Sequence, residues 1–459
     1  MNPFKHFAMF TMAERRTFWS KMLGAMVILA FGIGLTATTF AQNESDTLPP
    51  SQSDDVAGAV FVGTNHNNTT DPSEPANQVA MYRRAADGTL TLLGYFDTGG
   101  QGSGPGQRFA GDGLGSAHSV QLSQDRRWLF VTNAGSNTVS VFRVEEDSLQ
   151  LTDVVPTGDS SQSHRFPNSV TQHGDLVYVL NSADEGSITG FRLTQEGMLI
   201  PIPDSTRLLN ANQTRFPPDA LFNPTQVSFT PDGRQLVVTI KDGPPAAPSS
   251  SDIPTGPGRV LVFGVEDDGL PSEIFIQTNL NNLGPFGFSF DRGGNLLVSL
   301  FVGGPGLTGA AGSFQINPDG TLTPITPVVA NSELDTCWLE NNGRYAYGAN
   351  YGSGTVSSYR IGNDGSLELL ENVAGITDDL PGPPGKVQGS TPLDLRVSPD
   401  GRFLYNVLPG SGAVAGWRIN DDGSLTKIGE FGGLPDTVDG DHAPFDFSAL
   451  GSPAGIDVL

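Results

Sequence analysis

Two side chains able to exchange protons, His118 and Asp335, occupy corresponding positions in a pattern that recurs along this sequence. Histidine is the side chain best suited to proton transfer near neutral pH, and a carboxylate can activate water or orient an imidazole ring. We therefore consider both residues as candidate catalytic groups. The structural alternatives are a histidine that is hydrogen-bonded between neighbouring repeats and an aspartate that caps a loop or a strand.

Arginine–phenylalanine pairs form a second candidate group, and they occur at Arg108-Phe109, Arg165-Phe166 and Arg215-Phe216. In a chain with a formal net charge of −24, arginines on neighbouring loops can bind a carboxylate or a phosphate through bidentate hydrogen bonds. His164, beside Arg165, is a weaker candidate of the same group. In the structural alternative, each phenylalanine fills a gap between repeats and its arginine pairs with a nearby aspartate.

These residues belong to a repeated unit that is clearest at residues 118–151. The stretch contains four short runs rich in β-branched and aromatic residues, separated by turn-forming Gly, Asn and Asp clusters, as expected for antiparallel strands. Seven such units follow one another between residues 59 and 459, at a period of roughly 50 to 60 residues. The pattern predicts an all-β protein, a seven-bladed β-propeller of four-stranded blades. Because residues 453–459 match the start of a unit, we expect the C-terminal strand to pair into the first blade and close the ring.

Alignment of the units predicts which residues share one rim of the ring. The inner strands begin at His118, Asn168, Thr225, Pro285, Asp335, Leu393 and Ala454. Connections on this rim are long and the other turns are short, and long loops on a rigid scaffold commonly carry binding sites. We therefore place function on the long-loop face, where His118 and Asp335 lie far apart and can meet only through substrate or water. The substrate-binding candidates on this face are Arg108, His164, Arg165, Asn168, Arg215, Lys241, Asn133, Asn181 and Asn350.

The repeated pattern resembles that of a known family. The run HSVQLSQDRRWLFVTN at 118–133, followed by TVSVFRV at 138–144, is similar to the repeat of the seven-bladed lactonase propellers, and the resemblance covers nearly all of residues 59–459. That family includes 6-phosphogluconolactonases and carboxymuconate lactonising enzymes, which interconvert lactones and acids without a metal. The resemblance thus implies the fold, and an activity that needs no cofactor and no metal.

Our leading hypothesis is a lactonase-like hydrolase, or a lactonising isomerase, that acts on a small anionic lactone or acid. In this hypothesis His118 moves a proton while Arg165, Arg215 and Lys241 bind the negative charge that develops. The first alternative is a non-enzymatic exported propeller that binds a protein or a carbohydrate on the long-loop face. A calcium-dependent hydrolase ranks last, because no EF-hand pattern is present and solvated turns explain the Asn- and Asp-rich loops.

Composition and motifs exclude several other classes of protein. The negative net charge argues against nucleic-acid binding. The single cysteine, Cys337, excludes an intrachain disulfide and a Cys-based zinc site, and we expect it to be a small buried hydrophobe. No Walker or Rossmann glycine pattern and no Gly-x-Ser-x-Gly elbow is present. We expect a monomer whose partner is a small molecule.

Residues 1–41 are typical of an export signal. Basic residues, including Arg15 and Arg16, precede an apolar run at 22–35 that is short for a membrane span. The arginine pair resembles a bacterial twin-arginine signal, with Glu14 in place of the usual Ser or Thr. We expect a periplasmic or secreted protein, a disordered linker at 42–58, and no membrane insertion of the mature chain.

Overall fold

The computed structural model describes residues 56–104, 112–158, 165–241, 257–281, 283–377, 390–435 and 451–459. All of them belong to one compact unit, Asp54–Leu459. The predicted export signal and nearly all of the predicted linker lie outside the described residues, as do Arg108 and His164. No helix among the described residues is long and apolar enough to cross a membrane.

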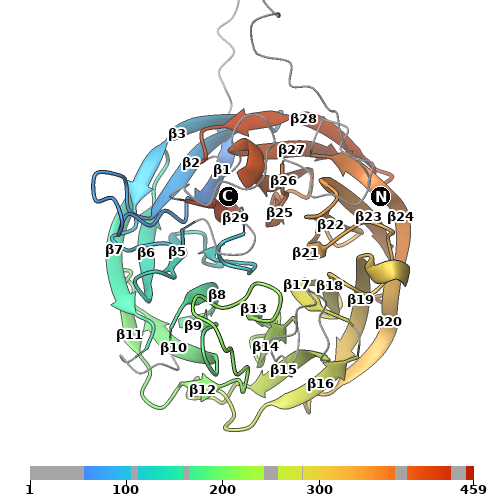
Figure 1. Cartoon of the computed structure of the whole chain (residues 1–459), viewed down its shortest axis with the longest axis horizontal. Helices are drawn as coiled ribbons and strands as arrows, with labels where there is room; N and C mark the ends of the chain where they lie inside the picture. Colours follow the sequence, from blue (N-terminus) through green and yellow to red (C-terminus); the bar gives the residue numbers. More distant parts are fainter. Residues whose placement is uncertain are drawn as a thin grey trace, which may run out of the picture. The chain divides into compact units, whose positions relative to one another are not determined.

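Seven antiparallel sheets form a ring around a common centre, as Figure 1 shows. From the centre outward, the first blade contains β29 (Ala454–Val458), β1 (Val56–Gly63), β2 (Gln78–Ala85) and β3 (Leu90–Asp97). The second blade contains β4 (Val120–Leu122), β5 (Trp128–Asn133), β6 (Thr138–Val144) and β7 (Leu149–Pro156). The third contains β8 (Pro167–His173), β9 (Leu176–Asn181) and β10 (Ser187–Leu193), with an outer edge divided between β11 (Leu199–Pro201) and β12 (Arg207–Leu208).

The other four blades repeat the same order. The fourth contains β13 (Pro224–Phe229), β14 (Gln235–Ile240), β15 (Gly258–Gly264) and β16 (Ile276–Leu280). The fifth contains β17 (Pro285–Phe290), β18 (Leu296–Leu300), β19 (Ala310–Ile316) and β20 (Leu322–Ala330). The sixth contains β21 (Thr336–Asn341), β22 (Tyr345–Asn350), β23 (Thr355–Ile361) and β24 (Leu367–Ile376). The seventh contains β25 (Leu395–Val397), β26 (Phe403–Leu408), β27 (Ala413–Ile419) and β28 (Leu425–Gly432).

The ring closes as the sequence predicts. The C-terminal strand β29 pairs antiparallel with β1, with Val458 opposite Val60 and Ile456 opposite Val62, and Figure 1 shows β29 beside β1 in the first blade. Closure covers the edge that β1 would otherwise expose, because each unpaired edge strand leaves a row of backbone groups without partners. The predicted seven-bladed fold is confirmed.

The strands follow from the residues that compose them. The second and third strands of each blade are largely buried, as in WLFVTN of β5, whereas most residues of the outer strand β24 are exposed or half-buried. Tight turns join the strands, and in the turn at residues 398–402 the Asp400 carboxylate accepts a hydrogen bond from the Arg402 amide while Gly401 adopts a φ of 70°, a conformation that glycine permits. Cys337 is buried, as expected, and burial raises the pKa of its thiol.

Candidate functional site

A loop segment, residues 112–118, crosses the centre of the ring at the level where the inner strands begin; we call it the channel segment. The Trp338 indole N–H donates to the Ser116 carbonyl at 2.9 Å, the Ser116 hydroxyl donates to the Asn168 carbonyl at 2.6 Å, and the Ala117 amide donates to the Thr225 carbonyl at 3.0 Å. Blades three, four and six therefore all bind the segment. Because Ser116 and Ala117 are almost fully buried, the segment fills the centre of the ring at this level.

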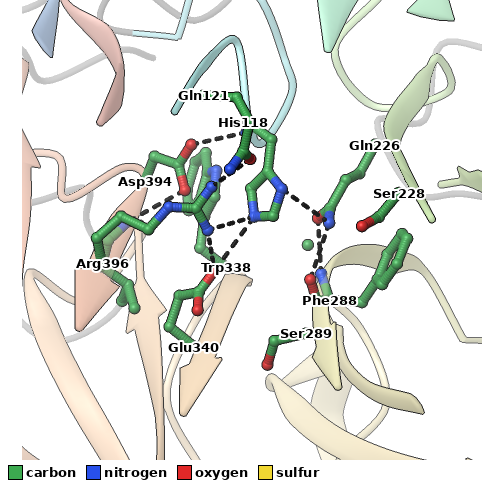
Figure 2. Close-up of polar contacts among 12 residues, drawn as sticks. His118, Gln121, Gln226, Ser228, Phe288, Ser289, Trp338, Glu340, Asp394 and Arg396 are labelled. Atoms are coloured by element: carbon green, nitrogen blue, oxygen red, sulfur yellow. Dashed lines mark hydrogen bonds and ion pairs between the residues drawn. The ribbon is translucent and has the colours of Figure 1, made fainter. Parts of the chain in front are cut away.

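The channel segment ends at His118, whose backbone turns sharply. His118 has a φ of 63°, a left-handed conformation that a non-glycine residue adopts at some cost in energy. Two contacts hold it there: the His118 amide donates to Asp394 Oδ2 at 2.8 Å, and the His118 carbonyl accepts from the Val170 amide at 3.0 Å. The imidazole consequently points across the ring toward the sixth and seventh blades (Figure 2).

His118 there meets an ion pair from the opposite blades. Glu340 Oε1, from β21, lies 3.1 Å from His118 Nε2. Arg396 Nη1, from β25, contacts the same glutamate oxygen and also lies beside His118 Nε2 (Figure 2). All three residues line one cavity. The Glu340 carboxylate also accepts from the Asn341 amide. Because each carboxylate oxygen has two lone pairs, Glu340 can still bind water in the cavity.

Two further residues hold the Arg396 guanidinium in place. Arg396 Nη2 donates to Gln121 Oε1 at 2.9 Å, and Arg396 Nε lies 3.5 Å from Asp457 Oδ1. Asp457 is itself fixed, because its Oδ2 accepts from the Leu122 amide at 2.6 Å and from Gln121 Nε2 at 3.1 Å. The arginine is thus held between carboxylates of the sixth blade and of the closing strand β29.

The cavity has a volume of about 500 Å³ and is lined by all seven inner strands. Each inner strand contributes one polar residue to the cavity at the same register position. In the blades whose inner strand leads into the second strand, this residue lies two positions before the turn; β29 has no such turn. We call this ring the central polar layer, and its members are Gln121, Thr171, Ser228, Ser289, Glu340, Arg396 and Asp457. Hydroxyl groups occupy blades three to five, and charged groups occupy blades six, seven and one.

The cavity reaches the rim that carries the short turns. Gln124, Arg126, Pro231 and Pro399 line it there. The cavity therefore opens on the opposite rim from the long-loop face, where we expect the site from loop length. On the long-loop side, the channel segment, which is the inner end of one long connection, occupies the centre of the ring. The short turns leave the other end of the central space accessible.

Burial sets the protonation states in the cavity. Burial and the neighbouring Arg396 lower the pKa of His118 to about 3, so the imidazole is neutral at physiological pH. Burial raises the pKa of Glu340 although Arg396 opposes the rise. Burial also raises the pKa of Asp394 to about 6. Burial alone would lower the pKa of Arg396, but the surrounding carboxylates, Glu340 first, raise it.

Asp335 does not join His118. It lines a separate cavity of about 30 Å³ together with Asp112 and Lys241, and burial raises its pKa. Lys241 donates to the Ala220 carbonyl at 2.8 Å, and its ammonium lies 4.1 Å from the centre of the Phe286 ring. The structure thus places the two candidate proton-exchanging residues in different cavities, and Lys241 lies with Asp335.

The two described arginine–phenylalanine pairs make ion pairs of their own. Arg165 forms hydrogen bonds of 2.9 and 3.2 Å with Asp184 and stacks on Phe216 at 4.2 Å. Arg215 pairs with Asp219 at 3.2 Å. Neither arginine lines the central cavity, so these contacts match the structural alternative for the pairs.

The four asparagine candidates are buried and also lie away from the central cavity. Asn133 donates to the Ser140 hydroxyl at 2.8 Å, Asn181 accepts from the Thr157 hydroxyl at 2.7 Å, and Asn350 accepts from the Thr336 hydroxyl at 2.6 Å. Each contact joins neighbouring chain segments where a second strand ends. Asn168 donates to the Pro224 carbonyl at 2.9 Å and so links the third and fourth blades.

The described residues form a closed all-β ring, and its central chamber holds a histidine, a glutamate and an arginine; this is the architecture of a seven-bladed β-propeller. The family described as "Lactonase, 7-bladed beta-propeller" matches residues 72–212 and 299–438, and the chain belongs to this family.

Curated relatives match over shorter stretches. A 6-phosphogluconolactonase from Formosa agariphila is 34% identical over 94 residues, which are 20% of this chain and 24% of that protein. A probable 6-phosphogluconolactonase from Arthroderma benhamiae is 29% identical over 111 residues, 23% of this chain and 24% of that protein. The aligned parts therefore span about a quarter of each relative.

Solved structures match over almost the whole ring. A putative 6-phosphogluconolactonase from Bacteroides fragilis superimposes with a TM-score of 0.59 at 16% identity, covering 90% of this chain and 99% of that one. The periplasmic gluconolactonase of Pseudomonas aeruginosa superimposes with a TM-score of 0.57 at 17% identity, covering 88% of this chain and 99% of that one. At these identities the similarity establishes the fold.

Proposed function

We propose that this protein is a hydrolase that opens a small lactone ring in the central cavity. The observation that carries the proposal is the convergence of His118, Glu340 and Arg396 from three blades on one chamber. Membership of the lactonase family and the names of the curated relatives support the same reaction class.

The three side chains supply what lactone hydrolysis needs. A water molecule at Glu340 attacks the carbonyl carbon while the Glu340–His118 pair takes its proton. The Arg396 guanidinium donates to the oxygen on which negative charge develops, and the buried setting strengthens that interaction. The carbon–oxygen bond of the ring then breaks, and the proton passes to the departing oxygen, which leaves a hydroxy acid.

The charges of the cavity favour a neutral, hydroxylated lactone. The formal charges of Arg126 and Arg396 balance those of Glu340 and Asp457 in the cavity wall, and Arg396 is already ion-paired. Thr171, Ser228 and Ser289 form a continuous arc of hydroxyl groups opposite the charged residues. We expected an anionic substrate from the arginine–phenylalanine pairs, but Arg165 and Arg215 lie outside this cavity.

A substrate panel tests the function. The purified protein should hydrolyse δ-gluconolactone without added metal, and His118→Ala should reduce the rate at least tenfold because the hydrogen bond to Glu340 is lost. A pH-stat assay that records acid release measures both rates. No turnover of any lactone, together with retention of a protein or carbohydrate ligand, would instead support the binding scaffold.

The unphosphorylated lactone should be preferred over its 6-phosphate. We expect kcat/KM for δ-gluconolactone to exceed that for the phosphorylated lactone about tenfold, because burying a phosphate beside Glu340 and Asp457 is costly when the buried cation there, Arg396, is already ion-paired. Arg126→Ala, at the exposed mouth of the cavity, should lower kcat/KM only for the phosphorylated lactone. A preference for the phosphorylated lactone in the unmodified protein would contradict the neutral substrate.

Between pH 4 and 8, the activity should fall only on the acid side of the profile. Glu340 must be ionised to accept a proton, and its pKa is raised above 4.5 by burial. Asp394, which holds the His118 amide, has a pKa of about 6 and ionises as the pH rises. We therefore expect kcat/KM to rise with pH up to about 6. His118, with a pKa of about 3, stays neutral throughout. A profile of kcat/KM between pH 4 and 8 should therefore show no descending limb near the ordinary histidine pKa of about 6.5.

We also propose that the protein is exported, since residues 1–41 carry a signal-like pattern and the Pseudomonas neighbour is a periplasmic protein. Signal removal would be visible as N-terminal sequence beginning near Gln42 in protein recovered from the periplasm. Recovery of the unprocessed chain from the cytoplasm alone would contradict export.

A further inference from the structure

Gln226 lies fully buried behind His118 and does not line the cavity. It belongs to β13 in the fourth blade, and its side chain reaches the backbone of β17 in the fifth (Figure 2). Gln226 Nε2 donates to the Phe288 carbonyl at 2.8 Å, and Gln226 Oε1 accepts from the Phe288 amide at 2.8 Å. Phe288 can offer both groups because β17 is the edge strand of its blade, and alternate residues of an antiparallel edge strand direct their N–H and C=O away from the paired strand.

These two hydrogen bonds fix the orientation of the amide group. A rotation by 180° would place the NH₂ against the Phe288 N–H and the oxygen against the Phe288 carbonyl, and would replace two hydrogen bonds with two repulsive contacts. The second hydrogen of Gln226 Nε2 therefore faces His118 Nδ1, 3.3 Å away. His118 Nδ1 must accept this hydrogen, so it carries no proton of its own.

On the other side of the imidazole ring, the Glu340 contact favours this assignment and the Arg396 contact opposes it. A neutral imidazole without a proton on Nδ1 carries it on Nε2, where Glu340 Oε1 is an acceptor at 3.1 Å. The opposite tautomer would let Arg396 donate to Nε2 but would set an Nδ1–H against the Gln226 N–H. Arg396 Nη1 has Glu340 Oε1 as an acceptor in either case, while a hydrogen of Nη1 also faces His118 Nε2. The orientation of the Gln226 amide, which two hydrogen bonds to Phe288 fix, therefore decides the tautomer.

We propose that Gln226 is a positioning residue that holds His118 in the Nε2–H tautomer, so that Glu340 and not His118 accepts the proton of the attacking water. The proposal rests on the hydrolysis described above. His118 Nδ1 is occupied by Gln226 and its Nε2–H by Glu340 Oε1, which leaves Glu340 Oε2 to take the proton. As the new carbon–oxygen bond forms and the ring carbon–oxygen bond breaks, Glu340 returns that proton to the departing oxygen.

Nitrogen NMR of the unliganded full chain tests the tautomer directly. In protein labelled with ¹⁵N in histidine, long-range ¹H–¹⁵N correlations distinguish the two tautomers, and the signals of His118 are those lost in His118→Asn. We expect the Nε2–H pattern at pH 7. The Nδ1–H pattern, or a doubly protonated ring, would overturn the proposal whether or not any lactone is hydrolysed.

The variant Gln226→Leu tests the role of the amide. It removes the hydrogen bond to Nδ1, so we expect His118 to populate both tautomers and kcat to fall at least about tenfold with KM little changed, because a catalytic group in the wrong tautomer is costly. Gln235→Leu is the matched control: Gln235 lies in the next strand of the same blade and donates to the Asn317 carbonyl. The control should leave the tautomer and kcat unchanged. An unaltered tautomer in a folded Gln226→Leu protein would overturn the assignment.

Discussion

Replacing Glu340 with glutamine should lower kcat/KM for lactone hydrolysis by about 10² to 10⁴, the range that a general base contributes. The glutamine side chain would keep an oxygen that can accept from Arg396 and His118, but an amide cannot take a proton from water at neutral pH. The loss should fall mainly on kcat, because substrate binding depends on the cavity wall and not on proton transfer. Steady-state kinetics on the purified variant measure both constants.

A glutamate at the other end of the same blade provides the control. Glu333 accepts a hydrogen bond from the Thr355 hydroxyl at 2.8 Å and does not line the central cavity. Glu333→Gln should therefore leave kcat/KM within about twofold of the unmodified protein, since substitutions away from the site change little. If Glu340→Gln kept more than about a tenth of the activity while remaining folded, Glu340 would not be the base.

The fold could be predicted from sequence because each repeat carries its own signal. Strand runs and turns recur in seven units, so an error in one unit leaves the period intact. The pairing of β29 with β1 followed from the similarity of residues 453–459 to the start of other units. His118 also stood out, since it differs from the residue at the same position in the other blades.

Glu340 and Arg396 could not be found in the same way, because the units were aligned from the start of each inner strand. Irregular pairing between Thr336 and Trp338, and between Pro285 and Phe288, shifts the count from that end. When residues are counted back from the turn between the first and second strands, one polar residue in each inner strand falls at the same position. This pattern is the signal in the sequence that reveals the central polar layer.

The partner of an arginine in an arginine–phenylalanine pair cannot be predicted from the sequence. A guanidinium that binds a ligand and one that pairs with a protein carboxylate have the same sequence pattern. Arg165 forms an ion pair with Asp184 at 2.9 Å, and Arg215 forms one with Asp219. Both ion pairs depend on how the loops fold. Loop length alone does not reveal that part of one long loop, the channel segment, occupies the centre of the ring.

Replacing Asp457 with alanine should destabilise the protein by about 3 kcal/mol or more, the usual cost of removing one partner of a buried ion pair. Asp457 lies on the closing strand and accepts from Leu122 and Gln121 of the second blade while facing Arg396 of the seventh. Alanine would leave those donors unsatisfied at the seam of the ring, with Arg396 held only from one side. Asp457→Asn keeps an oxygen for the Leu122 amide and should cost less.

Chemical denaturation measures the loss, and an exposed aspartate serves as the control. Asp364 accepts hydrogen bonds from Ser366 in a surface turn, so Asp364→Ala should leave the denaturation midpoint nearly unchanged. In Asp457→Ala, kcat/KM should also fall, because Arg396 can rotate away from the reacting oxygen once its Nε side is unpaired. A midpoint equal to that of the control would mean that β29 closes the ring through its backbone alone, and that the carboxylate at its centre contributes nothing to the seam.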